Sequence, residues 1–247
     1  MAPAWCADAP AVAHLLVDAL DDDLVVGGAD GHHLQRVRRL RGGEPVTAAD
    51  GAGAWRPYRV VDAAGGRLVL RADGPARPEP YLVPRLTVAC AITKGERPEV
   101  VVRQATELGA DAVLPVLTAR SVVRWDTSRR DAALERLGRV AREAAQQCRR
   151  ARLLRVEPFA ALSSLAGRSG LVVADREGCP AGALPDPGAA GWTVVVGPEG
   201  GLAADELAAL GDAPRLALGP HVLRADTAAV AVAAALAGSR RPADHPA

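Results

Sequence analysis

Short apolar runs alternate with stretches of helical periodicity from residue 85 to about residue 237. The apolar runs that predict buried strands lie at residues 86–92, 112–117, 171–174, 192–196 and 216–218. The stretches that predict helices lie at residues 99–108, 129–149, 204–210 and 225–237. Because strands and helices alternate, we predict an α/β fold with a mainly parallel sheet that is flanked by helices.

The amino-terminal third has a different pattern, with short β-like pieces separated by glycine turns. These pieces lie at residues 24–26, 45–47, 55–61 and 67–70. Closely spaced short strands of this kind predict a small β-barrel, and residues 32–41 predict one helical segment. Four prolines, Pro75, Pro78, Pro80 and Pro84, then disfavour both helix and central strand. We therefore predict a barrel domain at residues 1–75, a linker at 76–84 and an α/β domain at 85–240.

Two glycine-containing turns follow predicted strands and mark the candidate site. The first is Gly197-Pro198-Glu199-Gly200-Gly201, which comes directly after the apolar run at 192–196. The second is Leu218-Gly219-Pro220, which leads through residues 221–224 into the helix at 225–237. Residues without a Cβ let the backbone approach a ligand closely, and open α/β sheets bind ligands at the carboxyl ends of their strands. We therefore expect a small-molecule site between these two turns.

In the predicted helix at 129–149, apolar residues recur at spacings of three and four. This stripe consists of Leu134, Leu137, Ala141, Ala144 and Cys148. It predicts the buried face of the helix, so Cys148 is expected to pack rather than to act as a nucleophile. The four cysteines of the chain, Cys6, Cys90, Cys148 and Cys179, are far apart, which favours free thiols over a zinc site or a disulfide framework. His32 and His33 lack a third ligand at a recognisable spacing, so no metal site is expected.

Composition narrows the class of protein without identifying it. The chain has 247 residues, a formal net charge of +1 and a hydrophobic fraction of 49%. No apolar run reaches the roughly 18 residues that a membrane span requires. The amino-terminal region carries Asp18 and three further aspartates at 21–23 instead of the basic start of a secretory signal. We therefore expect a globular cytoplasmic protein.

Positive charge is concentrated rather than abundant. The densest basic segment is residues 32–41, which contains Arg36, Arg38, Arg39 and Arg41, and Lys94 is the only lysine in the chain. Arginines at this spacing suit the phosphates of an RNA backbone, although a solvated helix face would have the same composition. The pattern alone leaves both interpretations open.

Several short motifs, taken together and in order, identify a family resemblance. They are His32-His33-Leu34, Val37-Arg38-Arg39, Lys94-Gly95, Ala105-Thr106-Glu107-Leu108-Gly109, Glu143-Ala144-Ala145, Gln147-Cys148 with Arg150, Gly197 to Gly201, Leu218-Gly219, Val222-Leu223-Arg224 and Thr227-Ala228. Each motif is weak alone, but in this order over nearly the whole chain they resemble the ribosomal RNA small subunit methyltransferase E family. That family belongs to the SPOUT superfamily, whose members fold into a deep trefoil knot.

The resemblance implies a fold and an activity that periodicity does not reveal. The implied fold is a SPOUT-type trefoil-knotted parallel sheet flanked by helices and preceded by a small PUA-like β-barrel that binds RNA. The implied enzyme is a homodimer that uses S-adenosylmethionine as its cofactor and methylates N3 of a uridine in 16S ribosomal RNA. Its partner would then be the small ribosomal subunit, and neither a metal nor a membrane is implied.

The resemblance also assigns roles to residues of this sequence. The implied cofactor-binding residues are Val173, Gly197, Pro198, Glu199, Gly200, Gly201, Leu218, Gly219, Val222, Leu223 and Arg224. The implied RNA-binding residues are Arg36, Arg38, Arg39, Arg41, Lys94, Arg149 and Arg150, with Arg152 as a further candidate. Arg224 is the candidate for stabilising negative charge on the base, and Asp226, Glu199 and Glu107 are candidates for accepting its proton. Each acid has a structural alternative: a helix cap for Asp226, a loop brace for Glu199 and a partner for a basic residue for Glu107.

Four positions depart from the family pattern. The family usually has arginine where His221 stands, often glutamate where Asp226 stands, serine where Ala203 stands and glycine where Arg149 stands. The missing serine would remove a helix N-cap worth about 1 kcal/mol unless Asp205 or another group replaces it. Asp226 keeps the negative charge on a shorter side chain, which changes its reach.

Three alternative functions can be weighed against the sequence. A Rossmann-type methyltransferase or dehydrogenase would show G-x-G-x-x-G after an early strand, whereas this sequence has only Gly51-Ala52-Gly53 in its β-rich part. A non-catalytic RNA-binding or ribosome-assembly protein with the same fold is the second alternative, and the intact residues Gly197 to Gly201 and Arg224 argue against it. The third is a SPOUT methyltransferase that acts on another RNA.

Overall fold

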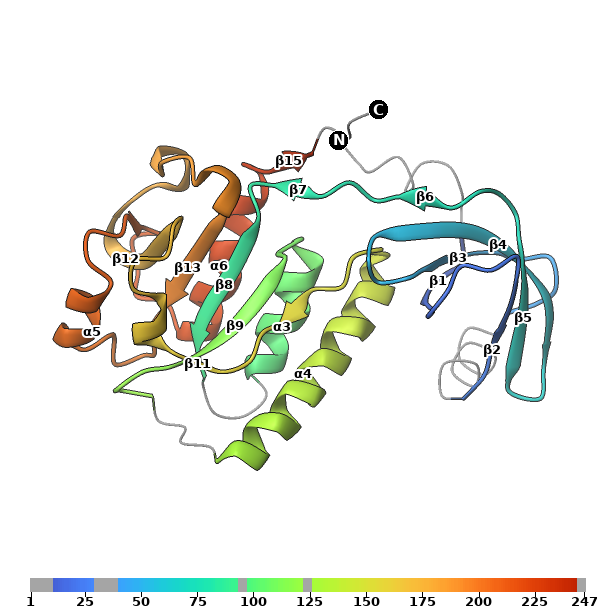
Figure 1. Ribbon diagram of the computed structural model, residues 1–247, viewed down its shortest axis with the longest axis horizontal. Coiled ribbons are helices and arrows are strands. Elements are labelled where there is room, and N and C mark those ends of the chain that lie inside the picture. Colours follow the sequence, from blue (N-terminus) through green and yellow to red (C-terminus); the bar gives the residue numbers. More distant parts are fainter. Residues whose placement is uncertain (1–10, 29–39, 93–96, 122–125, 244–247) are drawn as a thin grey trace. The chain divides into compact units, whose positions relative to one another are not determined.

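A computed structural model describes residues 11–28, 40–92, 97–121 and 126–243 of the chain (Figure 1). Its contacts divide the chain into two compact units, of which the first contains residues 1–79 and 145–153 and the second contains 80–144 and 154–247. The predicted division gave each domain one consecutive stretch and placed 145–153 in the second. The helical segment predicted at 32–41 lies outside the described residues except for its last two positions.

The first unit is built on one six-stranded sheet. Its strands are β1 (Ala13–Leu16), β2 (Asp23–Val26), β3 (Pro45–Ala49), β4 (Ala54–Ala64), β5 (Arg67–Ala72) and β6 (Arg77–Pro78). The order is β1-β3-β4-β5-β2, with β6 paired to β4. β1 and β3 are parallel and the other pairs are antiparallel. The predicted β-rich domain is therefore present, with β1 as an additional strand that the sequence pattern did not predict.

The second unit contains a parallel sheet with the order β10-β9-β8-β13-β12-β14, and β11 pairs with β9. Its strands are β8 (Leu86–Ala91), β9 (Ala112–Leu117), β10 (Arg155–Val156), β11 (Ala160–Ala161), β12 (Leu171–Cys179), β13 (Trp192–Val196) and β14 (Arg215–Leu216). All of these pairs are parallel. The predicted α/β class and its parallel sheet are confirmed.

Helices connect these strands at nearly the predicted positions. They are α3 (Arg97–Glu107), α4 (Thr127–Cys148), α5 (Ala204–Ala209) and α6 (Ala225–Ala237), and short 3₁₀ turns lie at η1 (Leu162–Leu165), η2 (Ala181–Ala183) and η3 (Gly188–Ala190). The strand β7 (Leu82–Val83), which precedes β8, pairs antiparallel with β15 (Arg241–Pro242), which follows α6. None of the described helices is long and apolar enough to cross a membrane.

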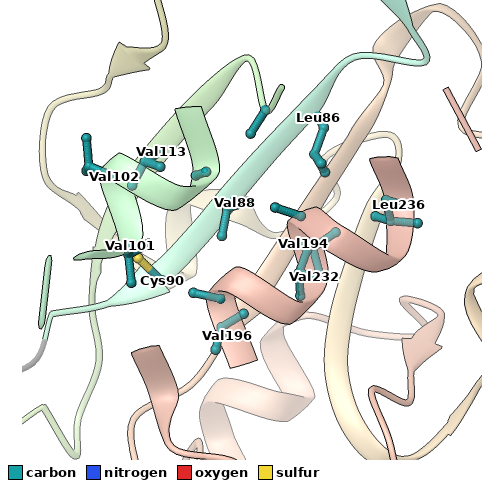
Figure 2. Close-up of a cluster of buried hydrophobic side chains, with 14 of the residues drawn as sticks. Leu86, Val88, Cys90, Val101, Val102, Val113, Val194, Val196, Val232 and Leu236 are labelled. Carbon is teal, nitrogen blue, oxygen red and sulfur yellow. The ribbon is translucent and has the colours of Figure 1, made fainter. Parts of the chain in front are cut away.

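Alternate residues of the central strands face two different cores. Val88 of β8 and Val194 of β13 join Val232 of α6 in one buried cluster (Figure 2). Ala89 and Val195, one position further along the same strands, belong to the cluster on the opposite face. Strands that are buried on both faces are apolar throughout, which is why continuous apolar runs predicted them correctly.

The end of α4 belongs to the core of the first unit. Ala145 lies in the last turn of this helix and Ala151 follows it, and both pack with Leu16, Ala49 and Trp55 in one buried cluster. Residues 145–153 therefore complete the hydrophobic core of the first unit, whereas the rest of α4 belongs to the second unit.

The predicted linker at 76–84 contains two short strands, β6 and β7. Pro78 of β6 pairs with Ala54 at the margin of the first sheet. A proline is tolerated at such an edge because its missing N–H would not have served a second neighbour. The prolines therefore excluded a helix or central strand, as predicted, but not short edge pairing.

Candidate functional site

The carboxyl ends of β12, β13 and β14 open into a cavity of about 500 Å³ in the second unit. Its lining residues are Val173, Ala174, Asp175, Arg176, Glu177, Val196, Gly197, Pro198, Glu199, Gly201, Leu202, Leu207, Leu216, Leu218, Gly219, His221, Val222, Leu223, Ala225 and Ala228. Both glycine-containing turns singled out in the sequence contribute to this one cavity. This is the position at which open α/β sheets bind ligands.

The first wall is the turn that follows β13, residues 197–201, which we name the glycine turn. Gly201 adopts φ +71°, and its N–H donates to the carbonyl of Pro198 at 2.8 Å. A residue with a side chain is strained in this left-handed conformation, so the turn requires glycine here. Gly197, Pro198, Glu199 and Gly201 line the cavity, whereas Gly200 does not.

The second wall is the segment that follows β14 and ends at α6. Ala217 donates its N–H to the carbonyl of Cys179 at 2.9 Å, which extends the contact between β12 and β14. Gly219 has φ +143°, again a conformation that favours glycine. Val222 also lines the cavity, and 82% of its surface is exposed, which is unusual for a large apolar residue. An apolar side chain so exposed at the edge of a cavity is suited to contact a ligand.

A charged edge at the end of β12 was not predicted as part of the site. Asp175, Arg176 and Glu177 line the cavity, and Asp175 forms an ion pair with Arg215 of β14. A hydrogen bond from the backbone N–H of Glu177, together with the Arg215 cation, holds the pKa of Asp175 below its usual value. The available signal was position, because these residues directly follow the predicted strand at 171–174.

Glu199 lies in the cavity wall, but its carboxylate is engaged. Arg97, the first residue of α3, donates from Nη1 to Oε1 of Glu199 at 2.9 Å. Both side chains are about half exposed. The carboxylate of Glu199 is therefore occupied by an ion pair that joins the turn to α3, whereas the structural alternative predicted for Glu199 from the sequence was a loop brace.

Arg224 and Asp226 lie at the start of α6 but do not line the 500 Å³ cavity. Arg224 is exposed at the N-cap position of α6. Asp226, in the first helical turn, instead lines a smaller cavity together with Cys90, Ile92 and Pro98. Its Oδ1 atom is buried and has no hydrogen-bond partner among the residues that the structure describes.

Cys90, which lines the same smaller cavity as Asp226, is a buried thiol. Burial raises the pKa of Cys90 to about 12. A thiol with such a pKa is not ionised at neutral pH and cannot serve as a nucleophile. Glu107, the remaining acidic candidate, is the last residue of α3 and does not line either cavity.

The predicted RNA-binding residues are only partly described. Arg36, Arg38, Arg39 and Lys94 lie outside the described residues, and Arg41 is exposed in the first unit. Arg149 and Arg150 are half-buried immediately after α4.

Arg149 occupies the position where the family usually has glycine, and its backbone explains that preference. It has φ +60°, the left-handed conformation that commonly ends a helix and that glycine adopts most readily. Its Nη2 atom donates to the carbonyl of Ala11 at 2.5 Å. The guanidinium of Arg149 therefore also contacts the backbone of the first unit.

Arg152 has a structural role within the first unit. Its Nε and Nη2 atoms donate to the carbonyl of Glu79 at 3.0 and 2.9 Å, and Nη1 donates to the carbonyl of Ala52. Its guanidinium also lies so close to Gly53 that a side chain at that position would overlap it. Burial raises the pKa of Glu79 against the opposing effect of Arg150.

Comparison with protein families matches both units. A model described as an RNA methyltransferase domain matches residues 80–237, and one described as an RNA methyltransferase PUA domain matches residues 26–73. The chain is 41% identical over 235 residues to the ribosomal RNA small subunit methyltransferase E of Mycobacterium bovis, with 86% of each chain covered. It is 28% identical over 217 residues to the Bacillus subtilis protein of the same name, with 82% of this chain and 85% of that protein covered.

Solved structures share the fold at lower sequence identity. A ribosomal RNA small subunit methyltransferase E from Neisseria gonorrhoeae, bound to S-adenosyl methionine, has a TM-score of 0.79 and 24% identity, covering 91% of this chain and 96% of that one. A putative methyltransferase from Legionella pneumophila, in complex with the same cofactor, has a TM-score of 0.77 and 22% identity, covering 92% and 96%. The fold expected from the sequence motifs is thereby confirmed.

Proposed function

The chain belongs to the ribosomal RNA small subunit methyltransferase E family, and from this premise we propose that it methylates N3 of a uridine in 16S ribosomal RNA with S-adenosylmethionine as methyl donor. The observation that carries the proposal is the meeting of the glycine turn and residues 218–223 at one cavity beyond the parallel sheet. Such a cavity suits a nucleoside-containing cofactor.

The size and lining of the cavity fit this cofactor. A volume of about 500 Å³ lies within the range of ligand pockets, which are mostly apolar with a few polar groups. Val173, Leu218 and Leu223 would contact the adenine ring, and the backbone of the glycine turn would approach the ligand where a side chain would obstruct it. When bound, S-adenosylmethionine supplies an electrophilic methyl group on a positively charged sulfur.

The protein must also remove the proton that uridine carries on N3. Asp226 is our preferred proton acceptor, because its Oδ1 atom is buried without a partner in the described part of the chain, whereas the carboxylate of Glu199 already binds Arg97. The exposed guanidinium of Arg224, at the N-cap of α6, would stabilise negative charge on the uracil oxygens. Both roles require the base to enter beside the start of α6.

The first unit would bind the RNA backbone. The PUA-domain match at residues 26–73 supports this role, and Arg41, Arg149 and Arg150 are the basic residues within its described part that we assign to phosphate contacts. Arg36, Arg38 and Arg39 of the same unit, together with Lys94 of the second unit, complete the proposed set. Binding through phosphates weakens as salt increases, because counterions compete for the same charges.

The proposal includes the cell compartment and the assembly state. We propose that the protein acts in the cytoplasm, because its proposed substrate is ribosomal RNA, and that it acts there as a homodimer. Sedimentation of the purified chain would measure its mass in solution. A monomer at concentrations that support full activity would contradict the dimer.

Cofactor binding and methyl transfer test the function separately. Titration calorimetry with S-adenosylmethionine should give saturable binding to the wild type and none to Ala228→Phe, which fills the cavity. Ala234→Phe is the matched control, since Ala234 is exposed on the same helix. Undiminished cofactor binding by Ala228→Phe would place the cofactor elsewhere.

Mass spectrometry of 16S ribosomal RNA tests the substrate. Small subunits from a strain that lacks this protein should lose one methylated uridine, and purified protein should restore the mark at N3. Cofactor binding without any methyl transfer would instead favour a non-catalytic role in RNA binding or ribosome assembly. A methyl mark on another RNA would identify a different target.

A further inference from the structure

We propose that Glu206 and Arg120 are positioning residues that hold the glycine turn in its cavity-lining conformation. The inference rests on the proposed function, because it assigns the turn to a cofactor site. Neither residue lines the cavity. Their action would be exerted through backbone groups of the turn and of the helix that follows it.

Glu206 joins two segments that are distant in the sequence. Its Oε2 atom accepts the N–H of Ala203 at 2.8 Å, immediately before α5. Its Oε1 atom accepts the N–H of Ala119 at 2.7 Å, in the loop that follows β9. A single carboxylate therefore fastens the start of α5 to that loop, with each oxygen occupied by one backbone donor.

Arg120 adds a second link from the same loop. Its Nη1 atom donates to the carbonyl of Gly200 at 2.7 Å. Gly200 is the one residue of the glycine turn that does not line the cavity. The contact thus holds the outer side of the turn while the other residues of the turn face the cavity.

Helix capping alone does not account for Glu206. Ala203, the N-cap residue of α5, has no side-chain acceptor, so the bond from Ala203 N–H to Glu206 provides part of the missing cap. The bond from Ala119 serves no capping purpose, because its donor lies 87 residues away in the sequence. This second bond is the observation that points to positioning.

The start of α5 is also part of the cavity wall. Leu202 and Leu207 line the cavity on either side of the Ala203 contact. Leu202 packs against Gly197, where an added side-chain carbon would lie 3.2 Å from its Cδ2 and Cγ atoms. Fixing Ala203 therefore fixes the apolar contacts on which the turn rests.

The ion pair between Arg97 and Glu199 is a weaker brace for the same turn. Both side chains are about half exposed, and exposed pairs of this kind contribute little. The bonds of Glu206 and Arg120 end on backbone groups instead, so they constrain the path of the chain directly. We assign the positioning role to these two residues for that reason.

The decisive variant is Glu206→Gln, which keeps the size of the side chain but has one acceptor oxygen for two N–H donors. Its amide NH₂ would face one of those donors. Two controls match it: Asp205→Asn removes the same charge from an exposed neighbour, and Leu210→Ala destabilises the buried end of α5 without touching the two links. Arg120→Ala tests the second link.

Two measurements on the full chain decide the proposal. Hydrogen exchange of the ligand-free protein should be about tenfold faster at the amides of residues 197–203 in Glu206→Gln, because a charge-assisted bond has been lost. Titration calorimetry should show about tenfold weaker binding of S-adenosylmethionine to Glu206→Gln and Arg120→Ala than to either control.

Each outcome separates this proposal from the function on which it rests. Unchanged exchange in Glu206→Gln, or equal loss of cofactor affinity in Leu210→Ala, would overturn the positioning role and leave the cofactor site intact. A wild-type chain that does not bind S-adenosylmethionine would contradict the proposed function, while the exchange measurement would still decide whether Glu206 holds the turn. If Glu206→Gln exchanges faster at residues 197–203 but binds S-adenosylmethionine as tightly as the wild type, the proposal that Glu206 positions the cofactor site would also be overturned.

Discussion

The carboxylate of Asp111 accepts a hydrogen bond from the guanidinium of Arg240, whose side chain has no exposed surface. The other donors of Arg240 bind the carbonyls of Pro84 at 2.7 Å, Gly109 at 2.5 Å and Leu82 at 3.3 Å. One side chain that follows α6 therefore connects the start of the second unit with the end of α3. The pair is a structural feature of this unit and lies outside the candidate site.

Replacement of Arg240 by methionine is expected to lower the free energy of unfolding by about 3–5 kcal/mol, because it leaves a buried carboxylate with one cation fewer. Three backbone carbonyls would lose their donor as well. Arg241→Met is the control, since Arg241 is exposed, and it should change stability by less than about 0.5 kcal/mol. Urea denaturation followed by circular dichroism measures both. Equal stability of the two variants would show that desolvation of Arg240 offsets its contacts.

His14 makes the first unit sensitive to acid. It is buried and shares a hydrogen bond of 2.8 Å with the hydroxyl of Thr47. Burial lowers the pKa of His14 to about 4, a backbone hydrogen bond with Arg150 opposes this effect, and the charge of Arg149 adds to it. The folded protein therefore keeps His14 neutral at pH values where the unfolded chain protonates it.

The sign of the pH effect follows from this difference. Because the folded pKa lies below the ordinary value of about 6.5, stability is complete above that pH and declines as the pH falls towards 4. For this residue the loss at pH 5 relative to pH 7.5 should be about 2 kcal/mol. In denaturant titrations at the two pH values, His14→Gln should lack this part of the loss, while His221→Gln, an exposed histidine, should retain it. Identical pH dependence of His14→Gln and wild type would contradict the assignment.

The substitution Asp226→Asn is expected to preserve stability but to lower the rate of methyl transfer. A buried carboxylate oxygen without a partner is unfavourable, so Asp226→Asn should not lower the free energy of unfolding. If Asp226 accepts the proton of the base, the rate of methyl transfer should fall about 100-fold. Transfer of labelled methyl groups to small subunits across pH measures the rate, with Asp205→Asn as the exposed control. An unchanged rate at every pH would remove Asp226 from the mechanism and leave Arg224 to be tested alone.

The sequence predicted the α/β unit well because local patterns determine it. Apolar runs that are buried on both faces, such as Val194 to Val196, identify themselves by composition. The glycines of the two turns likewise reveal a backbone requirement, which Gly201 and Gly219 meet with positive φ. Gly109, which directly follows the helix predicted at 99–108, has φ +81° two residues beyond the end of α3. The trefoil knot is a property of the whole chain path, so periodicity cannot reveal it.

What could not be predicted depends on partners that are distant in the sequence. β1 was missed because His14 resembles a polar surface residue in the sequence. In the structure His14 is buried and shares a hydrogen bond with Thr47, which lies 33 positions later. The contact between Glu206 and Ala119 spans 87 residues, and the Arg97 to Glu199 pair spans 102. No spacing rule connects such pairs. The side chains that support the candidate site could therefore be identified only from the structure, whereas the glycine-containing turns of its backbone could be recognised in the sequence.

Gly178 is predicted to be essential for the contact between β12 and β14. A side-chain carbon at Gly178 would lie 2.5 Å from the carbonyl carbon and oxygen of Arg215 and 2.7 Å from the backbone nitrogen of Ala217, which is closer than packed atoms approach. Gly178→Ala must therefore displace β14, and such overpacking should lower stability by about 1–3 kcal/mol. Because Leu216 and Leu218 line the cavity, cofactor binding should weaken as well.

Gly182→Ala is the matched control for this substitution. It introduces the same methyl group a few residues later, where an added carbon has no neighbour within 4 Å. Thermal denaturation and titration with S-adenosylmethionine should show losses for Gly178→Ala and wild-type behaviour for Gly182→Ala. If Gly178→Ala has the stability and affinity of the wild type, β14 tolerates displacement, and the wall formed by residues 216–223 does not depend on its register with β12.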